Sequence, residues 1–258
     1  MAIHPTAIVS PKAELDSSVE VGAHAIIDEH VKIAGRTKIW PNAHLTGYTE
    51  VGCDNRIHMG AVIGHEPQDV RFDPRCRSYL KIGDRNVIRE YVTIHRGTEP
   101  ESRTVIGDDN FLMVSCHVAH NCVIGNHAII ANAALLGGHV HVGDRAFVSG
   151  GVVVHQFIRI GRLAMISGNA RIAMDVPPFL LVAERNEVHG LNVVGLKRAG
   201  ISAEAQTELK RAYKILFRSG LSFAQAAEEA GTLTTQEARE LVEFVRSSTT
   251  GVCHARRD

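Results

Sequence analysis

Histidine is frequent in this chain, with 15 among 258 residues, and four histidines gather in one segment: His117, His120, His139 and His155. Within the same segment His120, Gly138 and Gln156 follow one another at equal steps of 18 residues. An imidazole suits proton abstraction from a hydroxyl, because its unperturbed pKa lies near neutrality. The alternatives are a three-histidine zinc site and a group of surface histidines without chemistry.

The step of 18 has a structural origin, because branched aliphatic residues recur at every sixth position. The series runs from Ile3 to Ile63, shifts its phase by one residue, and resumes from Ile82 to Ile172; 26 of its 27 positions are Ile, Leu or Val. A six-residue segment cannot bury its apolar side chain alone, so successive turns must stack. Three hexads form one triangular coil, with coils roughly 4.8 Å apart. The sequence therefore predicts a parallel β-helix in which His120, Gly138 and Gln156 form a column.

Two segments interrupt the ladder. Residues 64–81 contain two prolines and several basic residues, and we expect them to form a loop expelled from the coil. Residues 98–104, around Pro100, are a weaker interruption that keeps the phase. Loops on a rigid scaffold often carry function.

The ladder ends at Pro177 and Pro178, where the composition changes. The sequence predicts two parts: a β-helix over residues 1–178 with the inserted loop 64–81, and a connector with a small helical domain over residues 179–258. Ser202 and Ser222 are expected to cap helices, and Thr234 a third. The tail from Ser247 is expected to fray.

Charge and cysteine content narrow the classes of partner. The formal net charge is zero, which argues against general attraction to nucleic acid or an anionic membrane. No apolar run reaches the roughly 18 residues of a membrane span. The five cysteines are odd in number and lack a C-x-x-C pair. Reduced thiols fit a cytoplasmic protein, which is our expectation.

The repeat, an aliphatic residue often followed by Gly and then by a small residue, resembles the hexapeptide-repeat acyltransferases, whose β-helix is left-handed. Five longer motifs are similar to the acyl-[acyl-carrier-protein]:UDP-N-acetylglucosamine O-acyltransferase family, which begins lipid A synthesis. These motifs span residues 82–97, 117–122, 154–157, 175–178 and 190–198.

The resemblance implies that a 3-hydroxyacyl chain passes from acyl carrier protein to the glucosamine 3-hydroxyl of UDP-N-acetylglucosamine. His120 would be the general base, and the backbone N–H of Gly138 is our candidate donor to the oxyanion. No protein nucleophile, cofactor or metal is required, because a thioester is already activated. The family's site lies between the subunits of a homotrimer.

The resemblance also assigns substrate contacts. Asp69 and His117 would hold the sugar, with Arg71 and His139 beside them. The nucleotide side would be contacted by His155, Gln156, Asn192 and Arg198. Gly168 aligns with the position that limits acyl-chain length, and a glycine there leaves room for a long chain.

A basic segment could dock acyl carrier protein, which is acidic. Residues 185–218 contain seven basic and three acidic residues. The docking residues would be Lys197, Lys210, Arg211, Lys214 and Arg218; a solvated helix face is the alternative.

Three departures from the family keep rivals open. Asn121 stands where Asp is common, and Val194 and Ala199 stand where Glu and Arg are common. A 3-amino sugar nucleotide, acylated on nitrogen, is therefore an alternative acceptor. A zinc-dependent carbonic anhydrase-like protein and a non-catalytic scaffold are rivals of other classes.

Overall fold

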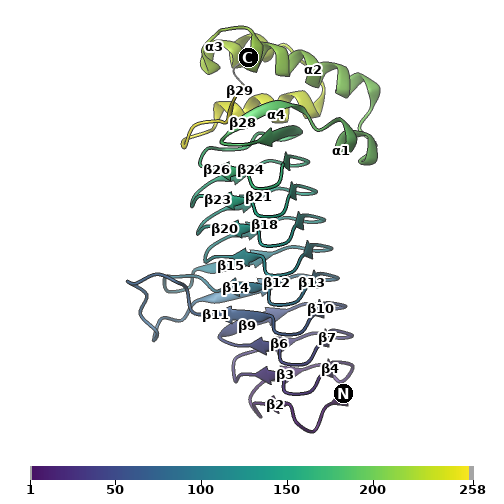
Figure 1. Ribbon diagram of the computed structural model, residues 1–258, viewed down its shortest axis with the longest axis vertical. Helices are drawn as coiled ribbons and strands as arrows, with labels where there is room; N and C mark the ends of the chain where they lie inside the picture. The colour runs from purple at the N-terminus through teal and green to yellow at the C-terminus, as the bar shows by residue number, and fades with distance from the viewer. Residues whose placement is uncertain (1, 256–258) are drawn as a thin grey trace.

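The computed structural model describes residues 2–255, and most of them wind into a three-sided parallel β-helix (Figure 1). Each side is one sheet. Sheet A comprises β1 (Ala2–Ile3), β4 (Glu20–Val21), β7 (Lys38–Ile39), β10 (Arg56–Ile57), β13 (Val87–Ile88), β16 (Phe111–Leu112), β19 (Ile129–Ile130), β22 (Phe147–Val148), β25 (Met165–Ile166), β27 (Leu180–Ala183), β28 (Glu187–Leu191) and β29 (His254–Ala255). Sheet B comprises β2 (Ile8–Val9), β5 (Ile26–Ile27), β8 (His44–Leu45), β11 (Val62–His65), β14 (Thr93–His95), β17 (His117–Val118), β20 (Leu135–Leu136), β23 (Val153–Val154) and β26 (Arg171–Ile172). Sheet C comprises β3 (Glu14–Leu15), β6 (Lys32–Ile33), β9 (Tyr48–Val51), β12 (Tyr79–Ile82), β15 (Arg103–Ile106), β18 (Val123–Ile124), β21 (His141–Val142) and β24 (Arg159–Ile160).

The aliphatic ladder forms the core, as its period predicts. Ile27, Leu45 and Ile63 stack in sheet B and are each at most 1% exposed. The residue before each of these side chains points outward, so one face of every strand meets solvent or a partner. This alternation makes a narrow core with three outward faces.

A buried polar ladder was not predicted from the sequence. Thr37, Asn55, Asn86 and Asn110 occupy the small-residue position in four coils and are at most 1% exposed. The amide oxygen of Asn55 accepts the backbone N–H of Asn86, and that of Asn86 accepts the N–H of Asn110. Because each side chain also donates to a carbonyl of a neighbouring coil, the buried polar atoms are satisfied.

Residues between β11 and β12 leave the prism as a long loop, which projects to the left in Figure 1. The prism closes behind it, because β12 pairs directly with β9. This arrangement confirms the expelled loop. A shorter excursion separates β14 from β15, so that Thr93 pairs with His117 across 24 residues instead of 18.

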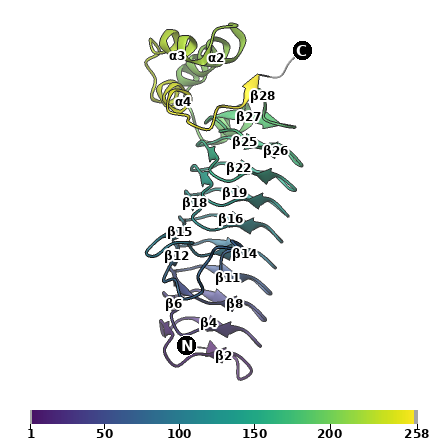
Figure 2. The ribbon, with the colours of Figure 1, turned by 90° about the vertical axis from the view of Figure 1, so that its left-hand side faces the viewer.

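The C-terminal part contains α1 (Val193–Arg198), α2 (Ala203–Arg218), α3 (Phe223–Ala230) and α4 (Gln236–Arg246), which cover one end of the prism (Figure 2). Ser202 and Ser222 cap α2 and α3 as predicted, and Ser222 forms a capping box with Gln225. The third cap was predicted wrongly. Thr235, not Thr234, precedes α4, and the carboxylate of Glu208 accepts both threonine N–H groups.

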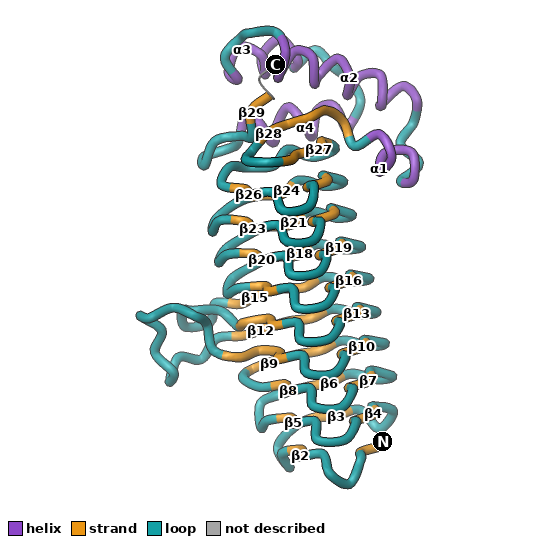
Figure 3. Tube along the Cα trace, viewed as in Figure 1, coloured by secondary structure: helices purple, strands orange, loops and turns teal. Residues whose placement is uncertain are grey.

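The connector is more regular than the sequence suggested. β27 continues sheet A in parallel with β25, β28 turns back antiparallel, and α1 follows it (Figure 3). The tail does not fray at Ser247, because β29 pairs with β28 and the Ser248 hydroxyl donates to Asp175. Within residues 2–255, no helix has the length and apolar character needed to cross a membrane.

Two arginines of the last coils hold α4 against the prism. Arg159 donates to the carboxylate of Asp175, which is 1% exposed, and its guanidinium lies 4.4 Å from the ring of Phe244. Arg162 pairs with Glu240 at 2.8 Å. The helical part is thereby fixed to the coils that follow the histidine segment.

Candidate active site

His120, Gly138 and Gln156 occupy one column at the corner between sheets B and C, as their spacing predicts. The N–H of His139 donates to the carbonyl of His120, and that of Phe157 donates to the carbonyl of Gly138, both at 2.9 Å. The imidazole of His120 lies over Gly138 so closely that a Cβ there would collide with the ring. Glycine is thus required at 138 by the histidine one coil below it.

The backbone N–H of Gly138 points to a possible role as a donor. Within residues 2–255 this N–H has no hydrogen-bond acceptor. Because it lies beside the imidazole of His120, it could donate to an oxyanion formed near that ring.

Hydrogen bonds fix the tautomer of His120. The amide oxygen of Asn121 accepts the backbone N–H of Thr98 at 3.1 Å and the Thr98 hydroxyl at 3.0 Å. A backbone N–H can only donate, so the atom facing it is the oxygen and not the nitrogen of the amide. Nδ1 of His120 lies 3.0 Å from the same oxygen and must therefore carry the proton. Nε2 is left with a lone pair, as a general base requires.

His117 and His139 flank the column and favour the neutral form. Nδ1 of His117 lies 2.7 Å from the hydroxyl of Thr93. Burial lowers the pKa of His117, and the neighbouring His120 lowers it further. The ring of His139 stands 5.3 Å from that of His120 and stacks at 4.7 Å on Phe157. Burial, followed by His120, also lowers the pKa of His139.

His95 is a site residue that the sequence analysis did not identify. It is 6% exposed, and its ring lies 4.8 Å from that of His117. Burial, with smaller contributions from the surrounding histidines, lowers its pKa to about 4. Nδ1 of His95 has no hydrogen-bond partner within the described residues. The pairing of β14 with β17 was the available signal, but the 24-residue step concealed it.

Asp69 reaches the histidines from the expelled loop. Its carboxylate accepts the backbone N–H of Arg71 at 2.9 Å and pairs with the Arg71 guanidinium at 3.2 Å. These contacts lower the pKa of Asp69, and the charge of His120 acts in the same direction. The loop therefore brings a carboxylate close to the column within one chain, while the side chain of Arg71 itself is 87% exposed.

Two of the residues expected at the nucleotide lie far from His120 within the chain. Asn192 and Arg198 line a cavity of about 230 Å³ with Phe147 and Met165 of sheet A, the side of the prism opposite the B–C corner. The amide of Asn192 is already used, since it accepts the N–H of Gly195 as the cap of α1 and donates to the carbonyl of Leu163. Sequence reasoning missed this capping role because it did not predict α1.

His155 and Gln156 lie exposed at the B–C corner, on the coil above Gly138. Gly168 lies at the next corner, between sheets A and B. A Cβ at Gly168 would meet only the carbonyl of Gly150, at 3.4 Å, so the space beside it is open. Sheet B separates the two corners, and its outward side chains include Leu135 and Val153, which are 43% and 46% exposed.

The remaining candidates fall into two groups. The predicted docking residues are all exposed: Lys197, Lys210, Arg211, Lys214 and Arg218. Burial raises the pKa of Cys116 and of Cys122 to about 12, so neither thiol suits nucleophilic attack. Among residues 2–255, no three His, Cys, Asp or Glu side chains are placed to hold a metal ion.

Similarities to known proteins bear on the same residues. The family described as UDP N-acetylglucosamine O-acyltransferase, domain 2, matches residues 175–253, and the bacterial transferase hexapeptide family matches residues 103–138. The chain is 45% identical over 258 residues to the acyl-[acyl-carrier-protein]–UDP-N-acetylglucosamine O-acyltransferase of Janthinobacterium sp. (strain Marseille), covering 97% of this chain and 98% of that relative. The enzyme of the same name from Synechocystis sp. is 52% identical over 186 residues, which are 72% of this chain and 67% of the relative.

The fold comparison agrees. The solved structure of Francisella novicida UDP-N-acetylglucosamine acyltransferase matches with a TM-score of 0.95 and 34% identity, over 99% of this chain and 95% of the other. This likeness confirms the left-handed hand that the hexapeptide resemblance predicted for the β-helix. The chain belongs to the acyl-[acyl-carrier-protein]–UDP-N-acetylglucosamine O-acyltransferase family.

Proposed function

We propose that the chain transfers a 3-hydroxyacyl group from acyl carrier protein to the 3-hydroxyl of UDP-N-acetylglucosamine, the first step of lipid A synthesis. The observation that carries the proposal is the orientation of His120, whose Nδ1–H is held by Asn121 and whose Nε2 is free to accept a proton. The family membership supplies the substrates.

The reaction is direct transfer. Nε2 of His120 removes the proton of the sugar hydroxyl as its oxygen forms a bond to the thioester carbon. The oxyanion receives a hydrogen bond from the N–H of Gly138. When the tetrahedral intermediate collapses, the carbon–sulfur bond breaks and the thiolate takes the proton from the imidazolium. The new ester and the free thiol balance the atoms, and the enzyme regains neutral His120.

The acceptor sugar would lie against the corner, where Asp69 and His117 approach the column. Arg71 would hold Asp69 in place rather than contact the sugar, because the two side chains pair. His139 shields one side of His120 and stacks on Phe157, so it would shape the site. Both neighbouring imidazoles have a lowered pKa, which limits competing positive charge near the base.

The site would be completed by a second chain of a homotrimer. Asn192 and Arg198 lie on the side of the prism opposite His120, so one chain cannot present both groups to one nucleotide. Placing sheet A of one subunit against the B–C corner of the next would join them to His155 and Gln156. The exposed guanidinium of Arg198 suits a phosphate.

The acyl chain would cross sheet B. Leu135 and Val153 offer exposed apolar surface between the corner that carries His120 and the corner that carries Gly168. The open space beside Gly168 suits the distal end of a long chain. The exposed basic residues of α1 and α2 would receive the acidic carrier protein. We place this reaction in the cytoplasm, where the five free thiols would stay reduced.

A donor-by-acceptor activity matrix tests the proposal. Wild-type protein is assayed with 3-hydroxyacyl carrier proteins of several chain lengths, against UDP-N-acetylglucosamine and against its 3-amino analogue. We expect transfer to the hydroxyl acceptor and a loss of about 10²- to 10⁴-fold for His120→Ala. Preferential transfer to the amine would reassign the acceptor, and full activity of His120→Ala would reject base catalysis by this residue.

A further inference from the structure

We propose that Arg96 is a positioning residue that clamps the first half of the expelled loop to the prism and so holds Asp69 beside His120. The inference rests on the proposed function for the role of Asp69, but the clamp itself can be measured without substrate. Neither the hexapeptide pattern nor the family motifs assign a role to Arg96.

Arg96 lies beneath the loop and directly below the site. It follows the last residue of β14, and continuing the pairing of Thr93 with His117 places it one coil below His120 in the same column. Its side chain is only 8% exposed. Burial of a guanidinium is costly unless its charge and donors are used, so a residue that merely filled this space would be apolar.

The guanidinium contacts the loop at three points. It donates to the carbonyl of Gly64 at 3.4 Å, lies 3.7 Å from the carboxylate of Glu66, and stands 5.2 Å from the ring of Phe72. Glu66 and Phe72 lie on either side of Asp69 in the sequence. Arg96 therefore brackets the carboxylate that is expected to hold the sugar.

The second half of the loop is anchored by other residues. The Ser78 hydroxyl donates to the carbonyl of Gly97 at 2.6 Å, the N–H of Glu101 donates to the carbonyl of Arg77, and the Cys76 thiol approaches the carbonyl of Thr98. In contrast, the ion pairs of Asp69 with Arg71 and of Asp73 with Arg75 join loop residues to each other. Such local pairs shape the loop but do not tie it to the coils.

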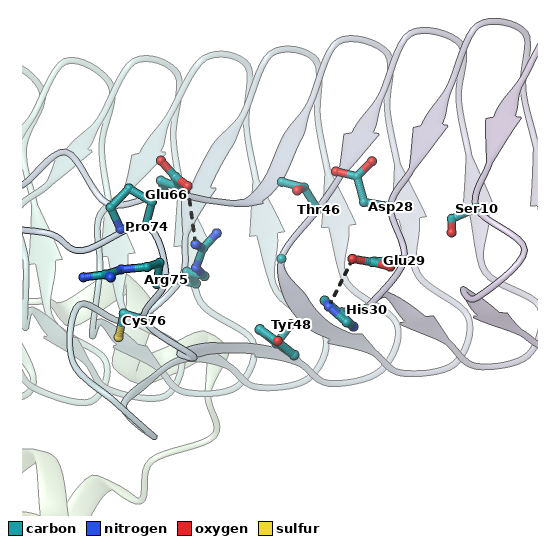
Figure 4. A pocket seen from close by; sticks show the side chains of 12 residues that line it. Ser10, Asp28, Glu29, His30, Thr46, Tyr48, Glu66, Pro74, Arg75 and Cys76 are labelled. Atoms are coloured by element: carbon teal, nitrogen blue, oxygen red, sulfur yellow. Dashed lines mark ion pairs between the residues drawn. The ribbon is translucent and has the colours of Figure 1, made fainter.

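A cavity of about 640 Å³ separates part of the loop from the coils and makes the clamp more important (Figure 4). Glu66, Pro74 and Arg75 line it from the loop, and Thr46 and Tyr48 line it from the prism. Arg96 lies at this cavity, and its Nε has no partner within the described residues. With little packing along this side, the loss of Arg96 would release the segment that carries Asp69.

The test compares Arg96→Met and Arg96→Lys with wild type, using Arg75→Met as the matched control. Arg75 is a loop arginine that is 90% exposed and pairs only locally with Asp73. Native protein is treated briefly with trypsin, and cleavage after Arg71 is followed by mass spectrometry. Cleavage in a native protein reports local opening, so we expect it to rise about tenfold in Arg96→Met and less in Arg96→Lys. Arg75→Met should match wild type.

Kinetics provide the second measurement. Arg96→Met should raise KM for UDP-N-acetylglucosamine about tenfold, with a smaller change in kcat, because a bound sugar can still recruit the loosened carboxylate. If cleavage after Arg71 and KM both remain at wild-type values in a folded Arg96→Met variant, the clamp is rejected. If the chain shows no acyl transfer at all, the proposed function fails while the difference in cleavage remains. If Arg96→Met does not fold, Phe72→Leu removes one contact from the loop side and must increase cleavage for the proposal to stand.

Discussion

Replacing Asn121 by Leu tests whether a neutral amide can orient the catalytic imidazole. The amide oxygen of Asn121 accepts three hydrogen bonds, two from Thr98 and one from Nδ1 of His120. Leucine has a similar size and no acceptor, so all three donors lose their partner together. The ring can then place its proton on Nε2, which blocks the atom that must take the proton from the sugar.

The magnitude follows from what the hydrogen bonds supply. General-base catalysis contributes about 10²- to 10⁴-fold, and a ring with the wrong tautomer loses part of that factor. We therefore expect kcat to fall about 10- to 100-fold, with little change in KM for either substrate. The donors are only partly buried, so the loss in the free energy of unfolding should be about 1 to 3 kcal/mol in total.

Asn121→Asp is the matched variant, because it retains the acceptor and adds a charge. A carboxylate stabilises the protonated imidazole. The acidic limb of the pH–rate profile should therefore move upward by about one unit, equivalent to about 1.4 kcal/mol. Steady-state assays from pH 5 to 9, with thermal melts of the same samples, separate the two effects. If Asn121→Leu keeps wild-type kcat while it remains folded, the orientation argument is wrong.

Three further predictions concern other parts of the chain. The pKa of His95 is lowered to about 4, so the unfolded chain binds a proton between pH 6.5 and 4 that the folded chain does not; stability should fall by up to about 3 kcal/mol across that window, and thermal melts of His95→Gln should show a shallower fall. Gly168→Met should leave the fold intact, since a Cβ there meets only the Gly150 carbonyl at 3.4 Å, but it should shift donor preference toward shorter chains in a competition assay. Glu240→Gln weakens the 2.8 Å pair with Arg162 and should lower the free energy of unfolding by about 1 kcal/mol, as measured by denaturant titration; an unchanged midpoint would show that α4 is held by other contacts.

The sequence predicted the repeating part of this molecule well because period six translates directly into register. Each anchor position has the same neighbours above and below, so the column of His120, Gly138 and Gln156 could be derived from spacing alone. The caps at Ser202 and Ser222 were equally local signals. Prediction succeeded where the determining contacts lie within one hexad or one helical turn.

The remaining features depend on contacts that spacing does not encode. Asn192 is the cap of a helix that is only six residues long, and its role depends on the Leu163 carbonyl from a distant coil. The polar ladder replaces small residues by asparagines of the same column, which a search for small residues excludes. Sequence alone could not show that these amides satisfy one another.

The same reasoning explains why the floor of the site was overlooked. Between Thr93 and His117 the chain makes an excursion of six residues, and the coil step becomes 24 residues. His95 and Arg96 therefore fall outside the 18-residue series, although both lie directly below the column that the series defines. The excursion supplies Thr98, whose N–H orients Asn121, while the longer loop supplies Asp69. Each departure from the repeat thus brings one group to His120, which a strictly regular prism could not do.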